Sequence, residues 1–468
     1  MSGDFDYDFL CIGSGPAGQR AAVQAAKLRK RVGIVECEVE IGGVCVHTGT
    51  MPSKTFREAV LSLADGSDAF HVGYGGGGGS DGPVVERLYA RVGDIVFRES
   101  RVQREQLRRN GVDIIPGMGS FAGPHEVAVR SSQGTRNVSA GKILVATGTK
   151  PARPAKICKD LPCVITSDDI LKLDELPRTM VVIGCGVIGV EYASMFAALG
   201  VEVTVVDGRT RPLEFLDSEI VDELVHQMRA KEVSFRLGEA VDRIELREGD
   251  APNLAVVHLE SGKRLVADLV LASTGRVGAS ESLDLDKVGL TADARGRLAV
   301  GATFQTEVPH IYAAGDIIGF PSLAATSSEQ GRLAACHAFG VEAGPMPLHF
   351  PVGIYAIPEI SMVGRTELDL TNAKIPYETG VARYREIARG QILGDDSGFL
   401  KLIFHAENRK LLGVHAIGTG ATELIHVGQS VIALGGGLDY FMTTVFNYPT
   451  LAECYKVAAF DAYNRLSV

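Results

Sequence analysis

The chain lacks several features that would assign it to common classes of protein. Its 468 residues include 57 acidic and 47 basic side chains, and the net charge of −10 argues against a general nucleic-acid binder. The most apolar region, residues 180–206, is interrupted by glycines, Glu191 and Glu202, so it predicts strands and a helix instead of a membrane span. The first residues contain no basic segment or long apolar stretch, so we expect no signal peptide and a cytoplasmic protein.

Cysteine is absent from the patterns that usually carry its chemistry. No C-x-x-C pair occurs among the eight cysteines, which are Cys11, Cys37, Cys45, Cys158, Cys163, Cys185, Cys336 and Cys454. No segment has zinc-ligand spacing, so we expect no metal, and no catalytic-serine arrangement is apparent. Reduced, mostly buried thiols are the default interpretation for a chain of this length.

Glycine, by contrast, is abundant, with 55 residues among 468, which exceeds the usual share of about 7%. Part of this excess lies in one pattern that occurs twice. The apolar run at residues 8–12 leads into Gly13, Gly15 and Gly18, and a helical stretch then precedes a second apolar run that ends at Glu36. This order predicts a strand, a phosphate-binding turn, a helix and a second strand.

The second copy begins with the apolar run at residues 180–183. It continues with Gly184, Gly186 and Gly189, a helix through Ala198 and a strand that ends at Asp207. The acid follows the third glycine by 18 positions in both copies (36 − 18 and 207 − 189). Glycines let the backbone approach a pyrophosphate at the N-terminus of a helix, and the acid accepts hydrogen bonds from ribose hydroxyls. Two matched copies therefore predict two dinucleotide sites.

Two further segments have distinctive compositions. Residues 73–82 are mostly glycine and predict a flexible surface loop. Residues 87–110 carry many arginines at helical spacing with Glu86, Glu99 and Glu105 interspersed, which favours a solvated helix face over a nucleic-acid-binding helix.

The segment from Gly42 to Lys54 resembles the redox-active disulfide loop of the flavoprotein disulfide reductases, the family of dihydrolipoamide dehydrogenase and glutathione reductase. Where that family has two cysteines, this chain has Cys45 and Thr50. A single thiol forms no intramolecular disulfide, so the relay of electrons from flavin to dithiol is interrupted. We expect Cys45 to be a packed remnant, although a charge-transfer contact or a reversible adduct would require only a thiolate here.

The resemblance implies FAD on the first glycine pattern. Residues 143–148 resemble the family's A-T-G crossing, and residues 306–316 resemble its second FAD motif, which ends in Gly-Asp. Asp316 would bind the ribityl chain. The residues expected to bind cofactor are Gly13, Gly15, Gly18, Glu36, Gly43, Lys54, Thr147, Gly148 and Asp316, together with Gly184, Gly186, Gly189, Asp207, Arg209 and Gly275.

The second glycine pattern is expected to bind NAD(H) or NADP(H). Asp207 favours a free ribose 2′-hydroxyl, whereas a guanidinium at Arg209 or Arg211 favours a 2′-phosphate. A site with both features would accept both cofactors. The alternative is that both arginines are ordinary solvated loop residues.

Further expectations about catalysis come from the resemblance. Lys54 and Glu191 occupy positions that pair beside the flavin in the family. The C-terminal segment around Tyr448 and Glu453 resembles a motif whose histidine and glutamate move protons for the partner subunit's thiols, but the histidine position is Tyr448. A substitute such as His47 is the alternative. Lys54, Glu191, Cys45, Tyr448 and Glu453 are thus the catalytic candidates.

The expected fold class is α/β, with two Rossmann-like domains that bind FAD and NAD(P) and a C-terminal α+β dimerisation domain. The expected division is 1–150 and 273–346 for FAD, 151–272 for NAD(P) and 347–468 for the interface. A homodimer or higher homo-oligomer follows from the resemblance, with no membrane or nucleic-acid partner.

The likeness is greatest to the soluble, Si-specific pyridine nucleotide transhydrogenases of this family. It implies ping-pong hydride transfer from NADPH through FAD to NAD, reversibly and without a redox-active disulfide. The alternatives are a dihydrolipoamide dehydrogenase-like disulfide reductase, an NAD(P)H:quinone or dye reductase, and a non-catalytic NADP(H)-binding redox sensor.

Overall fold

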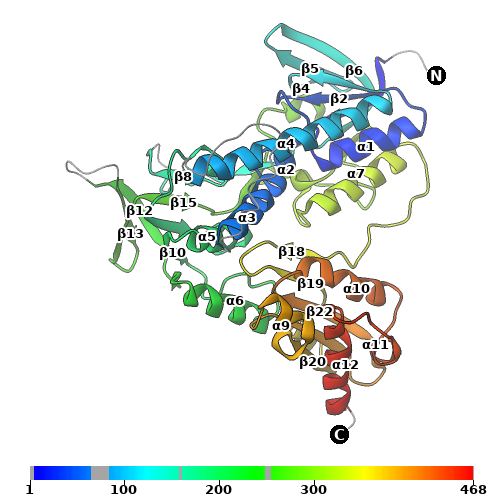
Figure 1. The fold of residues 1–468 in the computed structure, drawn as a ribbon. Helices are drawn as coiled ribbons and strands as arrows, with labels where there is room; N and C mark the ends of the chain where they lie inside the picture. The colour runs from blue at the N-terminus through cyan, green and yellow to red at the C-terminus, as the bar shows by residue number, and fades with distance from the viewer. Residues whose placement is uncertain (1–4, 65–83, 158–160, 248–253, 467–468) are drawn as a thin grey trace, which may run out of the picture.

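The computed structural model describes residues 5–64, 84–157, 161–247 and 254–466, and the predicted loop at 73–82 and Cys158 lie outside these ranges. The chain forms three lobes (Figure 1). The first contains the N-terminal strands and α1, the second contains α5 and α6, and the third contains the C-terminal helices. No helix within the described part of the chain is long and apolar enough to cross a membrane.

The first lobe is built on a seven-stranded sheet in which β6 (Gly134–Val145) is the central strand. Its parallel part contains β1 (Tyr7–Ile12), β2 (Val32–Glu36), β3 (Val112–Pro116) and β17 (Ile311–Ala313). Its antiparallel part adds β4 (Met118–Gly123) and β5 (Glu126–Ser131). Because β17 pairs with β6, the chain returns to this sheet after the second lobe, as the sequence predicts.

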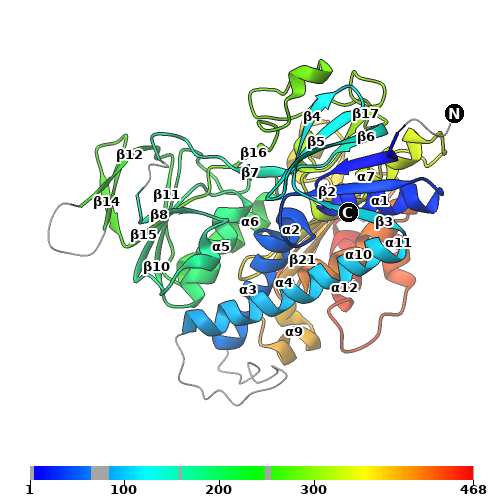
Figure 2. The ribbon, with the colours of Figure 1, turned by 90° about the horizontal axis from the view of Figure 1, so that it is seen from above.

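Three helices of the first lobe are α1 (Pro16–Lys27), α4 (Val84–Arg109) and α7 (Ala324–Ala338). Helices α1 and α7 pack so closely that a Cβ on Gly331 would lie 2.0 Å from the carbonyl oxygen of Ala17. Two further helices, α2 (Gly43–His47) and α3 (Thr50–Ala64), follow β2. Both ribbon views show α3 beside α5 of the second lobe (Figures 1 and 2).

The second lobe is a parallel sheet in the order β11, β10, β9, β15, β8. Its strands are β8 (Val164–Thr166), β9 (Thr179–Ile183), β10 (Glu202–Asp207), β11 (Ser234–Leu237) and β15 (Leu269–Ala272). A second sheet has β12 (Val241–Leu246), β13 (Ala255–Leu259) and β14 (Arg264–Ala267). The helices are α5 (Val187–Ala198), α6 (Ser218–Ala230) and the short 3-10 helix η2 (Ile170–Lys172).

Two antiparallel strands, β7 (Thr149–Pro151) and β16 (Arg276–Gly278), join the second lobe to the first. Two short 3-10 helices, η3 (Leu285–Val288) and η4 (Asp316–Ile318), belong to the first lobe. The two glycine patterns therefore lie on different lobes, and strands β7 and β16 form the linker that connects these lobes.

The third lobe is an antiparallel sheet in the order β18, β19, β22, β21, β20. The strands are β18 (Val352–Ile354), β19 (Ile360–Gly364), β20 (Tyr377–Arg383), β21 (Phe399–His405) and β22 (Leu411–Ile417). The helices are α8 (Glu367–Asn372), α9 (Ala388–Leu393), α10 (Ala421–Ala433), α11 (Leu438–Thr443) and α12 (Glu453–Leu466), with η5 (Tyr384–Glu386).

The two faces of the third sheet contribute to different cores. Leu400, Leu402 and Phe404 of β21 pack with α10, α11 and α12. Phe399, on the opposite face, joins a core that also includes Ile220 of α6 and Phe56 of α3. One of the apolar cores thus includes residues of all three lobes, and the architecture is the predicted fold class.

The elements around both glycine patterns match the sequence predictions closely. Helices α1 and α5 end at Lys27 and Ala198, and the second strands end at Glu36 and Asp207. The glycine turns and the apolar runs on either side are local signals, and this is why the element ends are predictable here.

The contact between β20 and α12 predicts the effect of one substitution. A Cβ at Gly380 would lie 1.9 Å from the carbonyl oxygen of Ala458 and 2.7 Å from the amide nitrogen of Ala462. Gly380→Ala should therefore lower the free energy of unfolding by about 2 kcal/mol or more, measured by urea denaturation.

Gly93→Ala is the matched control, because a Cβ at Gly93 of α4 meets nothing within 4 Å. It should leave stability unchanged or raise it by about 0.5–1 kcal/mol. Equal shifts in the two variants would contradict the packing argument.

Candidate active site

The first glycine turn combines close packing with an open surface. Gly13 has a φ of +102°, and a Cβ there would lie 2.4 Å from the carbonyl oxygen of Ala146. A Cβ at Gly18 would lie 2.0 Å from the carbonyl oxygen of Gly13, which fixes α1 against the turn. At Gly15 a Cβ would meet nothing within 4 Å, so the backbone here is open for a ligand to approach.

Glu36 organises this turn. Its Oε2 accepts hydrogen bonds from the Ser14 amide at 3.0 Å and the Ser14 hydroxyl at 2.5 Å, while Oε1 accepts one from the Glu38 amide at 2.9 Å. The residue is buried at the end of β2, where the parallel strands direct their carboxyl ends to the turn. Its carboxylate therefore lies beside the cavity with its position set by three donors.

A cavity of about 1090 Å³ extends from this turn across all three lobes. Among the predicted site residues it is lined by Gly13, Gly15, Glu36, Gly43, Cys45, Lys54, Thr147, Gly148, Glu191 and Asp316. Its volume is slightly above the usual range for ligand pockets, about 300–1,000 Å³. The remaining predicted residues do not line it: Gly18, Gly184, Gly186, Gly189, Asp207, Arg209, Gly275, Tyr448 and Glu453.

The donor set of this cavity fits a dinucleotide such as FAD. The Thr147 hydroxyl is buried and has no hydrogen-bond partner among the described residues, so a ligand can satisfy it. A Cβ at Gly43 would lie 2.9 Å from the Cα of Gly15, so the two backbones meet at the open side of the turn. Burial raises the pKa of Asp316, whose carboxylate lines the cavity and accepts a hydrogen bond from Ser327 at 3.4 Å.

Lys54 and Glu191 meet at one wall of the cavity. The Lys54 ammonium lies 2.8 Å from Oε2 and 2.9 Å from Oε1 of Glu191, which is 3% exposed. The amide of Tyr355 donates a hydrogen bond to Glu191 Oε1 at 2.8 Å, and the Lys54 ammonium lies 4.9 Å from the centre of the Tyr355 ring. One carboxylate thus connects α3, α5 and the segment after β18.

The sequence predicts no role for Tyr355, because its contact with Glu191 joins positions 164 residues apart. Arg276 was missed for the same reason. Its guanidinium donates to the Thr149 hydroxyl and carbonyl, both at 2.9 Å, and to Asp168 at 3.1 Å, and it lines the cavity. Gly275 beside it has a φ of +110° and joins the linker, with its carbonyl accepting from the Ala152 amide at 2.9 Å.

Cys45 lies in α2, and Thr50 begins α3 on the same side of the cavity. Burial raises the pKa of the Cys45 thiol, although a hydrogen bond with the Thr50 side chain opposes the shift. A raised pKa means that the thiol is protonated at neutral pH, and a protonated thiol is a poor nucleophile. His47 also lines the cavity, with its Nε2 3.0 Å from the Glu40 carbonyl oxygen.

The second glycine turn repeats the packing of the first. Cβ atoms at Gly184 and Gly189 would lie 2.4 Å from the Ser273 carbonyl oxygen and 1.9 Å from that of Gly184. At Gly186 the nearest atom would be an Arg209 nitrogen 4.0 Å away. Gly186 is therefore the open position, as Gly15 is in the first copy, and Arg209 faces it.

The two arginines after Asp207 have different partners. Arg209 forms a bidentate pair with Asp207, with Nε 3.0 Å from Oδ1 and Nη2 2.7 Å from Oδ2. Burial opposes ionisation of Asp207, but Arg209 and the Cys185 amide lower its pKa. Arg211 instead donates to the Ser218 carbonyl and Asp222 on α6. Only Arg209 is thus placed at the open glycine.

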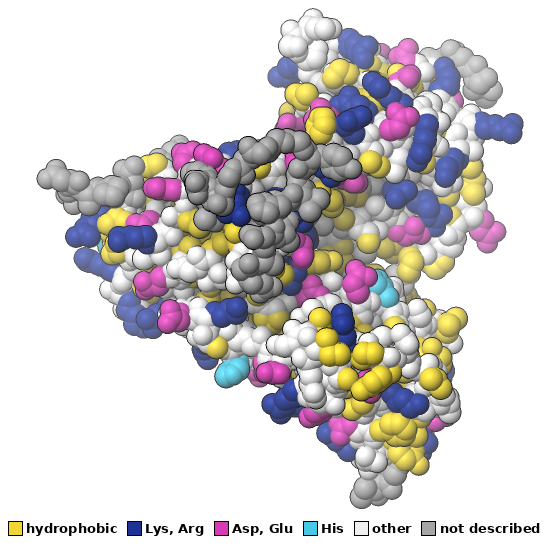
Figure 3. Space-filling view, in the orientation of Figure 1, with side chains coloured by type: hydrophobic (Ala, Val, Ile, Leu, Met, Phe, Trp, Pro, Cys, Tyr) yellow, Lys and Arg dark blue, Asp and Glu magenta, His cyan; other side chains and the backbone are white. Residues whose placement is uncertain are grey.

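Tyr448 and Glu453 lie in the third lobe, away from the cavity of their own chain. Tyr448 is 67% exposed, and Glu453 is the first residue of α12 with a buried Oε2 that has no partner among the described residues. Exposed apolar side chains gather on this lobe (Figure 3), and the exposed large ones include Leu434 and Val445.

Known proteins resemble the chain over nearly its whole length. It is 50% identical over 465 residues to "Soluble pyridine nucleotide transhydrogenase" of Mycobacterium tuberculosis, covering 98% of each chain. It is 41% identical to a protein of the same name from Marinomonas sp., covering 98% of this chain and 99% of the relative.

Solved structures with a similar fold also cover nearly the whole chain. "HOCl-induced flavoprotein disulfide reductase RclA" from Escherichia coli superposes with a TM-score of 0.87 at 26% identity, covering 97% of this chain and 99% of that one. LpdA from Mycobacterium tuberculosis gives 0.86 at 27% identity, with the same coverages. The family model "Pyridine nucleotide-disulphide oxidoreductase" matches residues 7–331, and that of its dimerisation domain matches 350–459. The chain belongs to the pyridine nucleotide-disulphide oxidoreductase family.

Proposed function

We propose that this chain is an FAD-dependent soluble pyridine nucleotide transhydrogenase that transfers hydride reversibly between NADPH and NAD. The observation that carries the proposal is Thr50, which contacts Cys45 in a site that retains the Lys54–Glu191 pair. The names of the relatives at 41–50% identity support the same activity. The Si-specific stereochemistry is part of the proposal.

The residues around the cavity would hold FAD and leave one side for a nicotinamide. Gly15, Gly43 and the N-terminus of α1 would bind the pyrophosphate. Glu36, Thr147 and Asp316 would form hydrogen bonds with the ribose and ribityl hydroxyls. When bound, FAD supplies the two-electron carrier that connects the two nicotinamide nucleotides.

The remaining contribution of the protein is to hold the cofactor and the nicotinamide and to orient them toward each other. Glu191 holds the Lys54 ammonium and the Tyr355 amide at fixed positions on the cavity wall, and Val187 and Ile188 of α5 line the cavity next to them. Because Lys54 is paired, its positive charge is fixed beside the reaction site, where it would tune the electronics of the cofactor. Glu191 is a positioning residue in this scheme, and no thiol takes part.

The nicotinamide nucleotides would bind on Gly184, Gly186 and Gly189 with the adenosine end near Asp207 and Arg209. The bidentate pair offers a carboxylate for a 2′-hydroxyl and a guanidinium for a 2′-phosphate. Gly275 would complete the linker side of the site.

The assembly and the location of the protein are further parts of the proposal. The division into domains at 1–150 with 273–346, 151–272 and 347–468 is part of the proposal, and the match of the dimerisation-domain model to residues 350–459 supports its last domain. The dimerisation domain and the exposed Tyr448 support a homodimer or larger homo-oligomer in which residues 447–453 reach the partner's flavin. The seven described cysteines are free thiols, which is usual in the cytoplasm, and the net charge of −10 supports the absence of a nucleic-acid partner.

Replacement of Cys45, the one thiol of the disulfide-like loop, tests the proposed transhydrogenase function. Cys45→Ser should lower the rate of thio-NAD reduction by NADPH less than about fivefold, which is under about 1 kcal/mol of barrier. The parent enzyme should reduce neither lipoamide nor glutathione disulfide at a comparable rate. The proposal fails if the parent reduces a disulfide efficiently and Cys45→Ser abolishes that reaction, because the chain would then be a disulfide reductase.

Removal of one guanidinium tests the nucleotide site. Arg209→Ala should raise the Kd of NADPH about 10- to 100-fold, because a charge-assisted hydrogen bond contributes about 1.5–3 kcal/mol, and should change the Kd of NADH much less. Arg211→Ala is the matched control, since Arg211 is engaged on α6 and should affect neither. Equal losses for NADH and NADPH in Arg209→Ala, measured by fluorescence titration, would contradict the assignment.

A further inference from the structure

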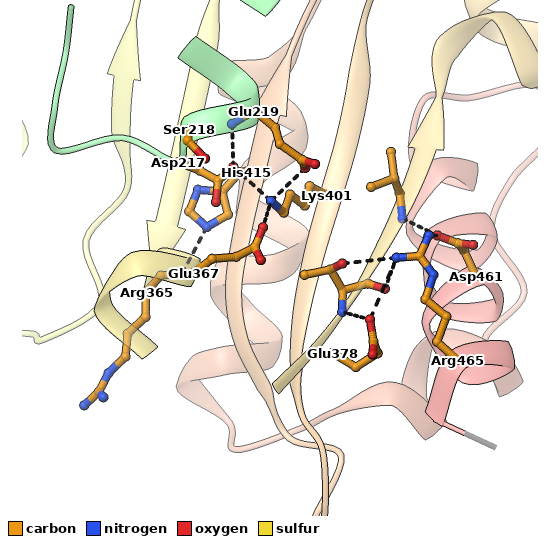
Figure 4. Close-up of polar contacts among 12 residues, drawn as sticks. Asp217, Ser218, Glu219, Arg365, Glu367, Glu378, Lys401, His415, Asp461 and Arg465 are labelled. Carbon is orange, nitrogen blue, oxygen red and sulfur yellow. Dashed lines mark hydrogen bonds and ion pairs between the residues drawn. The ribbon is translucent and has the colours of Figure 1, made fainter. Parts of the chain in front are cut away.

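A group of buried charges lies between the second and third lobes, outside the cavity. Lys401 of β21 is fully buried, and its ammonium lies 3.0 Å from Asp217 Oδ1 and 2.8 Å from Glu219 Oε2, with Glu367 of α8 also in contact. Figure 4 shows Asp217 and Glu219 at the start of α6, opposite the strand that carries Lys401. The group therefore joins the nucleotide-binding lobe to the C-terminal sheet.

This group contains its own cation. The carboxylates of Asp217, Glu219 and Glu367 lie close enough together to hold a metal ion, but the Lys401 ammonium contacts all three. Burial opposes the charge of Lys401, yet hydrogen bonds with Glu219 and Glu367 raise the pKa of its ammonium. The contacts are thus those of a charged lysine that is held from three sides.

The contact between Lys401 and Asp217 holds the N-terminal end of α6, because Asp217 is the residue that caps this helix. Asp217 is the N-cap of α6, with its Oδ1 accepting a hydrogen bond from the Glu219 amide at 3.2 Å. Lys401 and His415 are opposite each other on β21 and β22, and His415 Nε2 lies 3.0 Å from the Arg365 carbonyl oxygen. One end of α6 is thus held at a defined place on the sheet.

The lobe that α6 belongs to has a second set of directional contacts on α5, where Glu191 binds Lys54 and the Tyr355 amide and Ser194 accepts a hydrogen bond from the Ile357 amide. Its covalent connections to the first lobe are the two short strands β7 and β16. Beside the charge group, α6 contributes Ile220 to the apolar core that also includes Phe399 of β21. Apolar packing is non-directional, so at the α6 end of the lobe the charge group around Lys401 is the contact that fixes the orientation of the lobe about the linker.

We propose that Lys401 is a positioning residue for hydride transfer, because it fixes the nucleotide-binding lobe at the angle that brings α5 and its bound nucleotide to the cavity. The inference rests on the proposed function. Glu191 and Ile188 of α5 line the cavity, so a rotation of the second lobe moves them relative to Lys54 of the first. A displacement of about 1 Å can reduce the rate of a well-oriented reaction about 100-fold.

The test is anaerobic stopped-flow reduction of the holoenzyme flavin by saturating NADPH. Lys401→Met should reduce the rate constant about tenfold or more, while the Kd of 2′,5′-ADP stays unchanged because Gly186 and Arg209 move together with their lobe. Amide hydrogen exchange should increase at the N-terminus of α6. Arg465→Met is the matched control, since it removes ion pairs with Asp461 and Glu378 inside the third lobe only (Figure 4).

A variant that leaves three unneutralised carboxylates could fail to fold. The variant with Lys401→Met, Asp217→Asn and Glu367→Gln removes the pairing together with two of the three carboxylate charges, leaves only Glu219, whose side chain is 59% exposed, and should show the same slow reduction. Reduction at the parent rate in either folded holoenzyme would overturn the inference, as would a loss of 2′,5′-ADP affinity in proportion to the rate. A parent flavin that NADPH does not reduce would overturn the proposed function and the inference together.

Discussion

The carboxylate of Glu191 is the contact on which the geometry of the site depends. It binds the Lys54 ammonium of α3 with both oxygens and accepts a hydrogen bond from the Tyr355 amide in the third lobe. One turn later on α5, the Ser194 hydroxyl accepts a hydrogen bond from the Ile357 amide at 3.0 Å. A buried charge with good partners on every side is directional, so this helix is held at one register against both neighbouring lobes.

The same framework explains how a substitution in the disulfide-like loop can remove the dithiol reaction without changing the fold. Thr50 carries a hydroxyl and a methyl group where the resembling family has a thiol, and it still begins α3 and contacts Cys45. The glycine turns, the Lys54–Glu191 pair and the cavity do not depend on a disulfide. Electrons that reach the flavin then have no thiol pair to enter, and return to a nicotinamide is the route that the remaining residues support.

The limits of prediction from sequence follow from the range of each interaction. Both glycine patterns are local, so α1, α5, Glu36 and Asp207 lie where the sequence places them. Lys54 and Glu191 lie 137 residues apart, and only the resemblance to the flavoprotein disulfide reductases predicts their pairing. Tyr355, Arg276 and Lys401 could not be predicted, because each acts through contacts between lobes that no periodicity or spacing encodes. The different partners of Arg209 and Arg211 likewise depend on where α6 begins.

The most direct test of the account follows the two half-reactions separately under anaerobic conditions. Purified holoenzyme is mixed with NADPH while the flavin absorbance is recorded, and NAD is then added after free NADPH has been removed. The account predicts rapid bleaching, followed by rapid recovery of the oxidised flavin with formation of NADH. Bleached flavin that NAD leaves reduced, and that only a disulfide or a quinone reoxidises, would contradict it.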